Sequence, residues 1–343
     1  MHRAIHHTPW SIRSHRKSGL CALVALCAAL FVASWSGVAA GLEPPALLGT
    51  LATTEAVHEE YVVWDIVPTP LLSQSGIDPY GHGAFETPAL LESWLTRYIP
   101  LDYDGYLIVE WRDGVIEPLL AGSDDERLDS VIAEMVSVVD AIKQRRPGAL
   151  VGFAGIPVFD YWSHGDAWRA ALDAAKPLHD AVDAFFPDVR DVYGTEPERD
   201  LDRLGTYIAA TLEIAGDRPV FLYTSHRYEN VTERWGYSLI PRDEYVAHIA
   251  GLMAVEFGGR RPAGAVAAGN ERQTFTSGAS ERIKGGFVRT DPEWQRVRDV
   301  FAAEAQAGET VDEYLTRLHP YVFCLLAEAV RGEPCTLEPP RSE

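Results

Sequence analysis

The chain has 343 residues, a formal net charge of −20, 47% hydrophobic and 23% charged residues, and four cysteines. These proportions exclude a disordered chain, a collagen-like chain and a disulfide-framework miniprotein, because the apolar content suffices for a packed core. The acidic excess argues against a nucleic-acid partner, since phosphate binding needs clustered Lys and Arg. The length fits two small domains or one large barrel.

Residues 1–40 have the features of a cleavable signal peptide. All the charged residues in this stretch are basic: Arg3, Arg13, Arg16 and Lys17. An apolar run at 20–35 follows them, and small residues then give a cleavage site near Ala40. The run is shorter than the roughly 20 residues of a spanning helix, and an uncleaved anchor is the alternative. We expect a secreted or periplasmic protein with no membrane span after cleavage and a net charge of −20 − 4 = −24.

The mature chain begins with a lead-in at 41–58 that has no clear period, and then alternates short apolar runs with longer amphipathic ones. The expected strands are 61–67, 105–110, 150–155, 189–193, 219–224 and 264–268. The expected helices are 87–98, 124–145, 168–186, 196–215 and 242–257. Near-continuous apolar strands separated by helices predict a parallel sheet that is covered on its faces.

The strand ends favour a closed barrel over an open dinucleotide-binding sheet. Pro68, Thr69 and Pro70 follow the first expected strand, where a dinucleotide fold needs a glycine-rich turn. Several later strands end in polar or aromatic residues, and a β/α barrel places its chemistry at those carboxyl ends. We predict an α/β fold, a TIM-type barrel of seven or eight strands at 59–285, with a C-terminal helical extension at 286–343.

Glu110 is the leading catalytic candidate. It is a single acid at the end of an apolar strand, and Trp111 and Arg112 follow it directly. A partly buried carboxyl group in that position is suited to protonate a glycosidic oxygen. The alternative is a solvated carboxylate that pairs with Arg112.

Seven segments form an ordered series: VWDIVPTP (63–70), ETPALLESWLTRYIP (86–100), GYLIVEWRDG (105–114), VGFAGIPVFDYW (151–162), FFPDV (185–189), RPVFLYTSHRYEN (218–230) and the stretch at 241–270. In this order, over roughly residues 60–270, they resemble the hyaluronidase-like glycoside hydrolases, a family of secreted TIM-type barrels. Each segment alone is weak evidence, and the order is what is informative.

The resemblance implies a glycosidase that cleaves glycans beside a β-linked N-acetylhexosamine and needs no cofactor. Glu110 would be the general acid, while the acetamido oxygen of the substrate attacks the anomeric carbon. The side chains that would bind the glycan are Tyr161, Tyr228, Tyr223, Trp111, Arg112 and Arg227. The two arginines could bind a uronate carboxylate, although the acidic chain makes a neutral glycan at least as plausible.

The chain departs from the family pattern at three positions. Ile108 stands in place of the aspartate that orients the acetamido group, Ala268 in place of a tryptophan that borders the sugar, and Phe159 in place of a cysteine. Asp65 or Asp160 could replace the missing carboxylate if barrel closure brings either beside Glu110. Ordinary loop capping is the alternative for both.

These departures keep two other functions open. One is a catalytically inactive glycan-binding or structural surface protein that kept the fold. The other is an unrelated barrel enzyme.

Cys324 and Cys335 are the cysteines that remain after cleavage. In an oxidising compartment, two thiols eleven residues apart can close a small loop, and two buried free thiols are the alternative. His226 and His248 have no second ligand at metal spacing, so we expect no metal site.

Overall fold

The computed structural model describes residues 45–51, 58–122, 125–159, 167–190, 197–228, 237–269, 275 and 291–340. The strands are β1 (Ala46–Gly49), β2 (Ile66–Pro68), β3 (Leu71–Ser73), β4 (Tyr106–Glu110), β5 (Leu150–Phe153), β6 (Phe221–Ser225) and β7 (Gly264–Ala268). They form two parallel sheets, with the orders β2-β1-β7-β6 and β3-β4-β5.

Backbone hydrogen bonds join the two sheets into a ring. On one side, β2 and β3 are the two halves of one extended stretch: the Thr69 N–H donates to Gly49 of β1, and the Ile108 N–H of β4 donates to Pro70. On the other side, the 184–189 segment pairs in parallel with both β5 and β6. Within the described part of the chain, the ring therefore has seven strand positions: β1, β2 with β3, β4, β5, the 184–189 segment, β6 and β7. The expected TIM-type barrel is confirmed.

Alternation along the strands separates two apolar layers. Every second side chain, including Tyr106, Ile108, Phe186, Tyr223 and Val266, belongs to one buried cluster inside the ring. The side chains between them, such as those at 107 and 109, pack outward against the helices. This is the arrangement expected for a strand that is buried on both faces.

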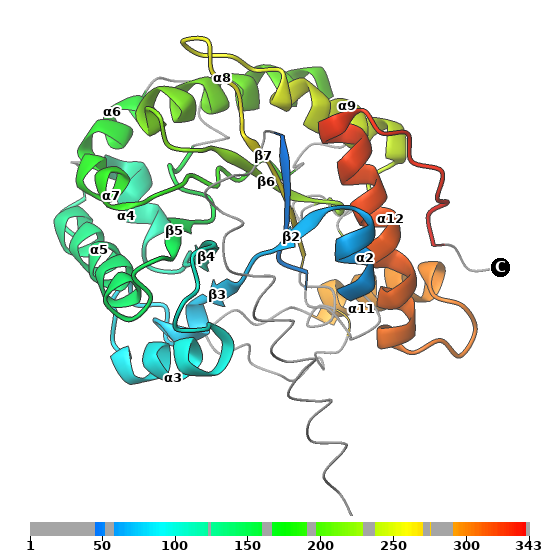
Figure 1. The fold of residues 1–343 in the computed structure, drawn as a ribbon, viewed down its shortest axis with the longest axis horizontal. Helices are drawn as coiled ribbons and strands as arrows, with labels where there is room; N and C mark the ends of the chain where they lie inside the picture. The colour runs from blue at the N-terminus through cyan, green and yellow to red at the C-terminus, as the bar shows by residue number, and fades with distance from the viewer. Residues whose placement is uncertain are drawn as a thin grey trace, which may run out of the picture.

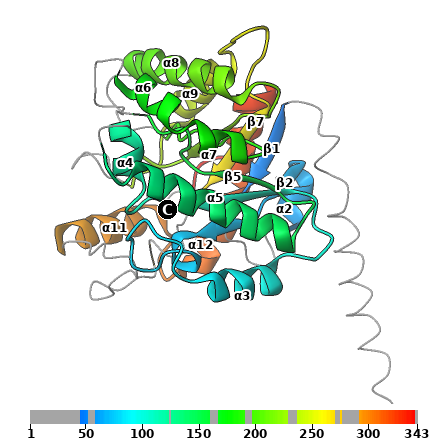
Figure 2. The same ribbon diagram turned by 90° about the vertical axis from the view of Figure 1, so that its left-hand side faces the viewer.

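The helices surround the strands (Figure 1). They are α2 (His58–Val63), α3 (Pro88–Tyr98), α4 (Ile116–Ala121), α5 (Leu128–Arg145), α6 (Ala167–Ala174), α7 (Lys176–Ala181), α8 (Pro197–Ala215), α9 (Arg242–Met253), α11 (Asp291–Glu304) and α12 (Val311–Arg331), with a 3-10 turn η3 at Gln74–Gly76. Figure 2 shows α4, which follows the carboxyl end of β4, on the same side of the ring as α11.

The beginning of the fold differs from the sequence expectation. The lead-in contributes β1, which lies between β2 and β7. Residues 61–63 of the expected first strand are in α2, and 66 and 67 are in β2. A run of three apolar residues at 61–63 suits either structure, and here only Tyr61 is buried while Val62 and Val63 are exposed.

The last helix of the fold, α12, continues through Pro320. A proline inside a helix costs about 3 kcal/mol. Burial of many apolar side chains on both sides of Pro320 offsets that cost. A capping box of Thr310 and Glu313 begins the helix. Since α12 packs against β1, β7, α2 and α9, it forms part of the barrel wall.

Candidate active site

Glu110 lies at the carboxyl end of β4 on the face that points into the barrel. Tyr106 and Ile108 belong to the interior cluster, and Leu107 and Val109 to the outer one. The two-residue period of a strand therefore directs Glu110 inward, one layer above Ile108. The side chain is half-buried and forms no hydrogen bond or ion pair with any described residue.

Three charged side chains surround the same mouth of the barrel. Arg112 donates to the carboxylate of Asp188 at 2.8 Å, and Arg190 donates to the same carboxylate through its Nε and a terminal nitrogen. Burial alone would raise the pKa of Asp188, but the two guanidinium groups outweigh it and lower the pKa to about 2. Arg112 remains 45% exposed.

Tyr223 lies just beneath these charges, on the inward face of β6. It is 4% exposed, and its hydroxyl forms no hydrogen bond with any described residue. Burial raises the pKa of Tyr223 well above its usual value, and the negative charge of Glu110 adds to the rise. The hydroxyl is therefore a neutral donor, and it lies close enough to Glu110 to feel its charge.

Trp111 is not a substrate-binding residue. It is fully buried in the outer layer, because it follows Glu110 and points to the opposite face. Its indole N–H donates to Asp78 at 3.2 Å. The same carboxylate accepts the backbone N–H groups of His82 and Gly83. Trp111 thus fixes a loop beside the barrel mouth and has no surface to offer a sugar.

Arg227 and Tyr228 are also committed to the protein itself. Arg227 pairs with Glu304 of α11 at 2.8 Å and donates to the Tyr314 hydroxyl of α12 at 2.6 Å. The Tyr228 hydroxyl donates to Glu244 at 2.8 Å, at the start of α9. Both side chains are at least nine-tenths buried. The expected uronate-binding role of Arg227 and sugar-binding role of Tyr228 are wrong for this structure.

Asp65 lies at the wrong end of the barrel to assist Glu110. It precedes β2, whereas Glu110 ends β4, and parallel strands place these positions at opposite ends of the ring. Asp65 is 85% exposed and pairs with Arg331 at 3.1 Å. Asp160 and Tyr161 lie outside the described residues.

Two of the three departures from the family pattern, Ile108 and Ala268, occupy interior positions. Ile108 is fully buried and Ala268 is 3% exposed, and both belong to the interior cluster. Neither can donate or accept a hydrogen bond through its side chain. The floor of the mouth is therefore apolar at Ile108, directly below the candidate acid.

Asp188 and Arg190 are the site residues that the sequence reading missed. The FFPDV motif (185–189) contains Asp188, but the strand predicted at 189–193 begins one residue after it. The alternation of Ala184, Phe186 and Asp188 was the available signal, since the first two fill the barrel interior. The apolar side chains of Ala184 and Phe186 do not indicate that the next inward position is charged.

Cys324 and Cys335 form a disulfide, with Cα atoms 5.2 Å apart. The bond ties the chain beyond α12 back to that helix, as expected. The signal peptide at 1–40 lies outside the described residues. Within the part of the chain that the structure describes, no helix is long and apolar enough to cross a bilayer. That part also has no cluster of three or more His, Cys, Asp and Glu side chains that could hold a metal.

No protein-family model matches the chain, and no curated protein sequence is detectably similar to it. Solved structures that are similar to it in three dimensions include two of bee venom hyaluronidase. The monoclinic crystal structure of bee venom hyaluronidase has a TM-score of 0.53 and 12% identity, over 75% of this chain and 97% of that chain. The same venom enzyme in complex with a hyaluronic acid tetramer has a TM-score of 0.51 and 12% identity, over 75% and 96% of the two chains. The protein described here therefore has a hyaluronidase-like β/α-barrel fold.

Proposed function

We propose that the protein is an exported glycoside hydrolase that cleaves glycans beside a β-linked N-acetylhexosamine, with Glu110 as general acid. The observation that carries the proposal is the position of Glu110. Its carboxyl group enters the barrel from the last residue of β4, at the end where β/α barrels perform catalysis. No described side chain forms a hydrogen bond or an ion pair with this carboxyl group, so the group is available to a substrate.

The chemistry follows from the carboxyl group and from the substrate itself. Glu110 gives its proton to the glycosidic oxygen as the bond from that oxygen to the anomeric carbon breaks. The acetamido oxygen of the substrate forms a new bond to that carbon, which gives a cyclic intermediate. Water then opens the intermediate and returns a proton to Glu110. Tyr223 can donate its hydroxyl proton as a hydrogen bond to a substrate oxygen below the cleaved bond.

An accessible guanidinium group at the mouth favours an anionic glycan. Arg112 pairs with Asp188 but remains 45% exposed to solvent. A guanidinium group binds a carboxylate in a planar, two-pronged contact. Arg112 is therefore the group we assign to a uronate carboxylate, in spite of the acidic chain as a whole. The hyaluronic acid tetramer bound by the similar venom enzyme is a ligand of this chemical type.

Ile108 favours a second function, a barrel that binds a glycan without cleaving it. A buried aliphatic side chain cannot orient an acetamido group or offset the positive charge that develops at the anomeric carbon. Asp65, one of the acids that could have compensated, lies at the other end of the ring.

The two functions are distinguished with purified mature protein on a panel of neutral and uronate-bearing acetamido-sugar polymers. Hydrolysis should require Glu110, so Glu110→Gln should lower turnover by about 100-fold or more. The matched control is Glu117→Gln, because Glu117 is 81% exposed on α4. Turnover that survives in Glu110→Gln would reject the general-acid assignment. Glycan binding without turnover in the wild type would favour the second function.

A further inference from the structure

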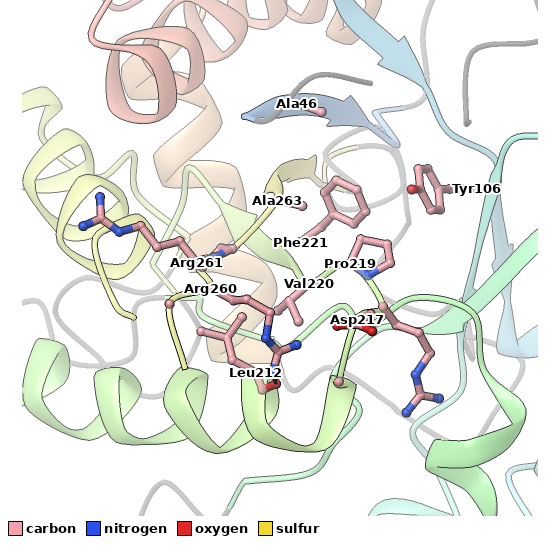
Figure 3. A pocket seen from close by; sticks show the side chains of 14 residues that line it. Ala46, Tyr106, Leu212, Asp217, Pro219, Val220, Phe221, Arg260, Arg261 and Ala263 are labelled. Carbon is pink, nitrogen blue, oxygen red and sulfur yellow. Dashed lines mark hydrogen bonds between the residues drawn. The ribbon is translucent and has the colours of Figure 1, made fainter. Parts of the chain in front are cut away.

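A second hollow lies at the amino end of the barrel, away from Glu110. It has a volume of about 580 Å³. Its walls come from the first residues of the strands and the turns that precede them, including Ala46, Tyr106, Phe221 and Ala263 (Figure 3). The volume lies within the range of small-molecule sites. In β/α barrels this end usually serves stability alone, so the proposed glycosidase reaction gives the hollow no role.

Small residues on two neighbouring strands create the space. β1 and β7 approach so closely at Gly264 that an added Cβ atom would lie 1.8 Å from the carbonyl oxygen of Ala46. Ala46 and Ala263, which line the hollow beside this contact, have side chains of a single methyl group and fill little of it. On the other side, Tyr106 and Phe221 pack edge to face with ring centroids 4.9 Å apart and form an apolar wall.

A glycine turn places Arg260 at the rim. Gly258 and Gly259 have φ values of 60° and 78°, which favour glycine, and Phe257 and Arg260 exchange backbone hydrogen bonds across them at 3.0 and 3.1 Å. One terminal nitrogen of Arg260 donates to Leu212 at 2.7 Å. Its other guanidinium nitrogens form no hydrogen bond or ion pair with a described residue. A half-buried guanidinium with unused donors therefore lines the hollow.

The other charged side chains of the lining are differently engaged. Arg218 donates to the carbonyl oxygens of residues at the ends of α7 and α8. Arg261 pairs with Glu256 and extends away from the apolar wall in Figure 3. Asp217 is exposed and has no partner among the described residues. Because Glu256 balances Arg261, the remaining charges of the lining are Arg218 and Arg260 against Asp217, a local surplus of one positive charge on a chain whose formal net charge is −20.

We infer that this amino-end pocket binds a small organic anion with an apolar body. The anionic group would accept hydrogen bonds from the unused donors of Arg260, and the apolar body would contact Phe221, Pro219 and Val220. A desolvated charge-assisted hydrogen bond fixes the orientation, while burial of the apolar body supplies affinity. The pocket and Glu110 lie at opposite ends of the ring, so the two sites should bind independently.

The probe is 1-anilinonaphthalene-8-sulfonate, whose fluorescence rises when it leaves water, and its uncharged parent N-phenyl-1-naphthylamine tests the need for charge. Native protein should bind the sulfonate with a saturable signal, and Arg260→Gln should weaken it about tenfold. Asp217→Asn should strengthen it, because a repelling charge is removed. Arg97→Gln makes the same charge change on α3, where Arg97 stacks on Tyr98, and should have no effect. Near-UV circular dichroism checks that each variant keeps its tertiary packing, because partly folded states also bind this dye.

Ala263→Leu fills the hollow without a change of charge, and it should weaken both probes. Equal effects of Arg260→Gln and Arg97→Gln would overturn the assignment of the anion to Arg260. Binding of the uncharged probe that matches the sulfonate in wild type and in Arg260→Gln would show an apolar cavity only, and would also overturn it. The Glu110→Gln variant should bind the sulfonate normally, whether or not the proposed glycosidase activity exists.

Discussion

The guanidinium of Arg112 lies 2.8 Å from the carboxylate of Asp188, and this ion pair spans β5, the strand that separates their two positions in the ring. Arg190 donates to both oxygens of the same carboxylate. The pair holds the end of β4 to the 184–189 segment, two strand positions away. It therefore fixes the shape of the mouth into which Glu110 projects.

Asp188→Asn should lower the free energy of unfolding by about 2 kcal/mol at pH 7, because its pKa is lowered from 3.8 to about 2 in the folded state. A lowered pKa gives stability that is present above pH 4 and is lost as the pH falls toward 2. The difference between variant and wild type should shrink over that window. Urea unfolding at several pH values measures it, with the exposed Asp129→Asn as control. A difference that stays constant with pH would show that Asp188 is not held ionised.

Tyr223→Phe should leave stability nearly unchanged, since the hydroxyl has no described hydrogen-bond partner to lose. If the hydroxyl contacts substrate, turnover on the active polymer should fall by about tenfold. Steady-state kinetics and thermal unfolding on the same samples test both statements. Unchanged kcat and KM would leave Tyr223 as part of the barrel core only.

Arg227→Met should destabilise the protein by about 3 kcal/mol or more, because it removes the cation that neutralises the largely buried Glu304. The loss should detach α11 from the loop after β6 without a change of KM at temperatures where the variant is folded. The exposed pair of Lys176 and Asp180 offers the control, and Lys176→Met should change stability by less than about 0.5 kcal/mol. A raised KM with unchanged stability in Arg227→Met would restore its substrate-binding role.

Reduction of the Cys324–Cys335 disulfide should lower the free energy of unfolding by about 3 kcal/mol, from the chain entropy that an eleven-residue closure removes from the unfolded state. Thermal unfolding with and without a reductant measures the loss. The double variant Cys324→Ala with Cys335→Ser should unfold near the reduced wild type and should not respond to the reductant. An equal response of both proteins would mean that the reductant acts elsewhere.

The helices and the later strands were readable from the chain because their signals are local. Helices such as α3 and α8 follow the amphipathic period closely, and β4 and β7 are short apolar runs between turns. Glu110 was found for the same reason, since a lone acid at the end of such a run is visible without a fold.

The roles of the flanking residues depended on alternation through the closed ring. Trp111 adjoins Glu110 in sequence but faces the helices, and Arg227 is a strand-end arginine like Arg112 but meets a glutamate almost eighty residues away. β1 was hidden in a stretch without a period because four buried residues carry no pattern that distinguishes them from a loop.

The amino-acid sequence by itself determined the alternation of strands and helices and the acid at the end of β4, because apolar period and charge are properties of neighbouring residues. Only the tertiary structure decided which charges meet. Barrel closure places Asp188 beside Arg112 and sends Asp65 to the opposite end, and those outcomes follow from strand order and register, which no local stretch of the chain encodes.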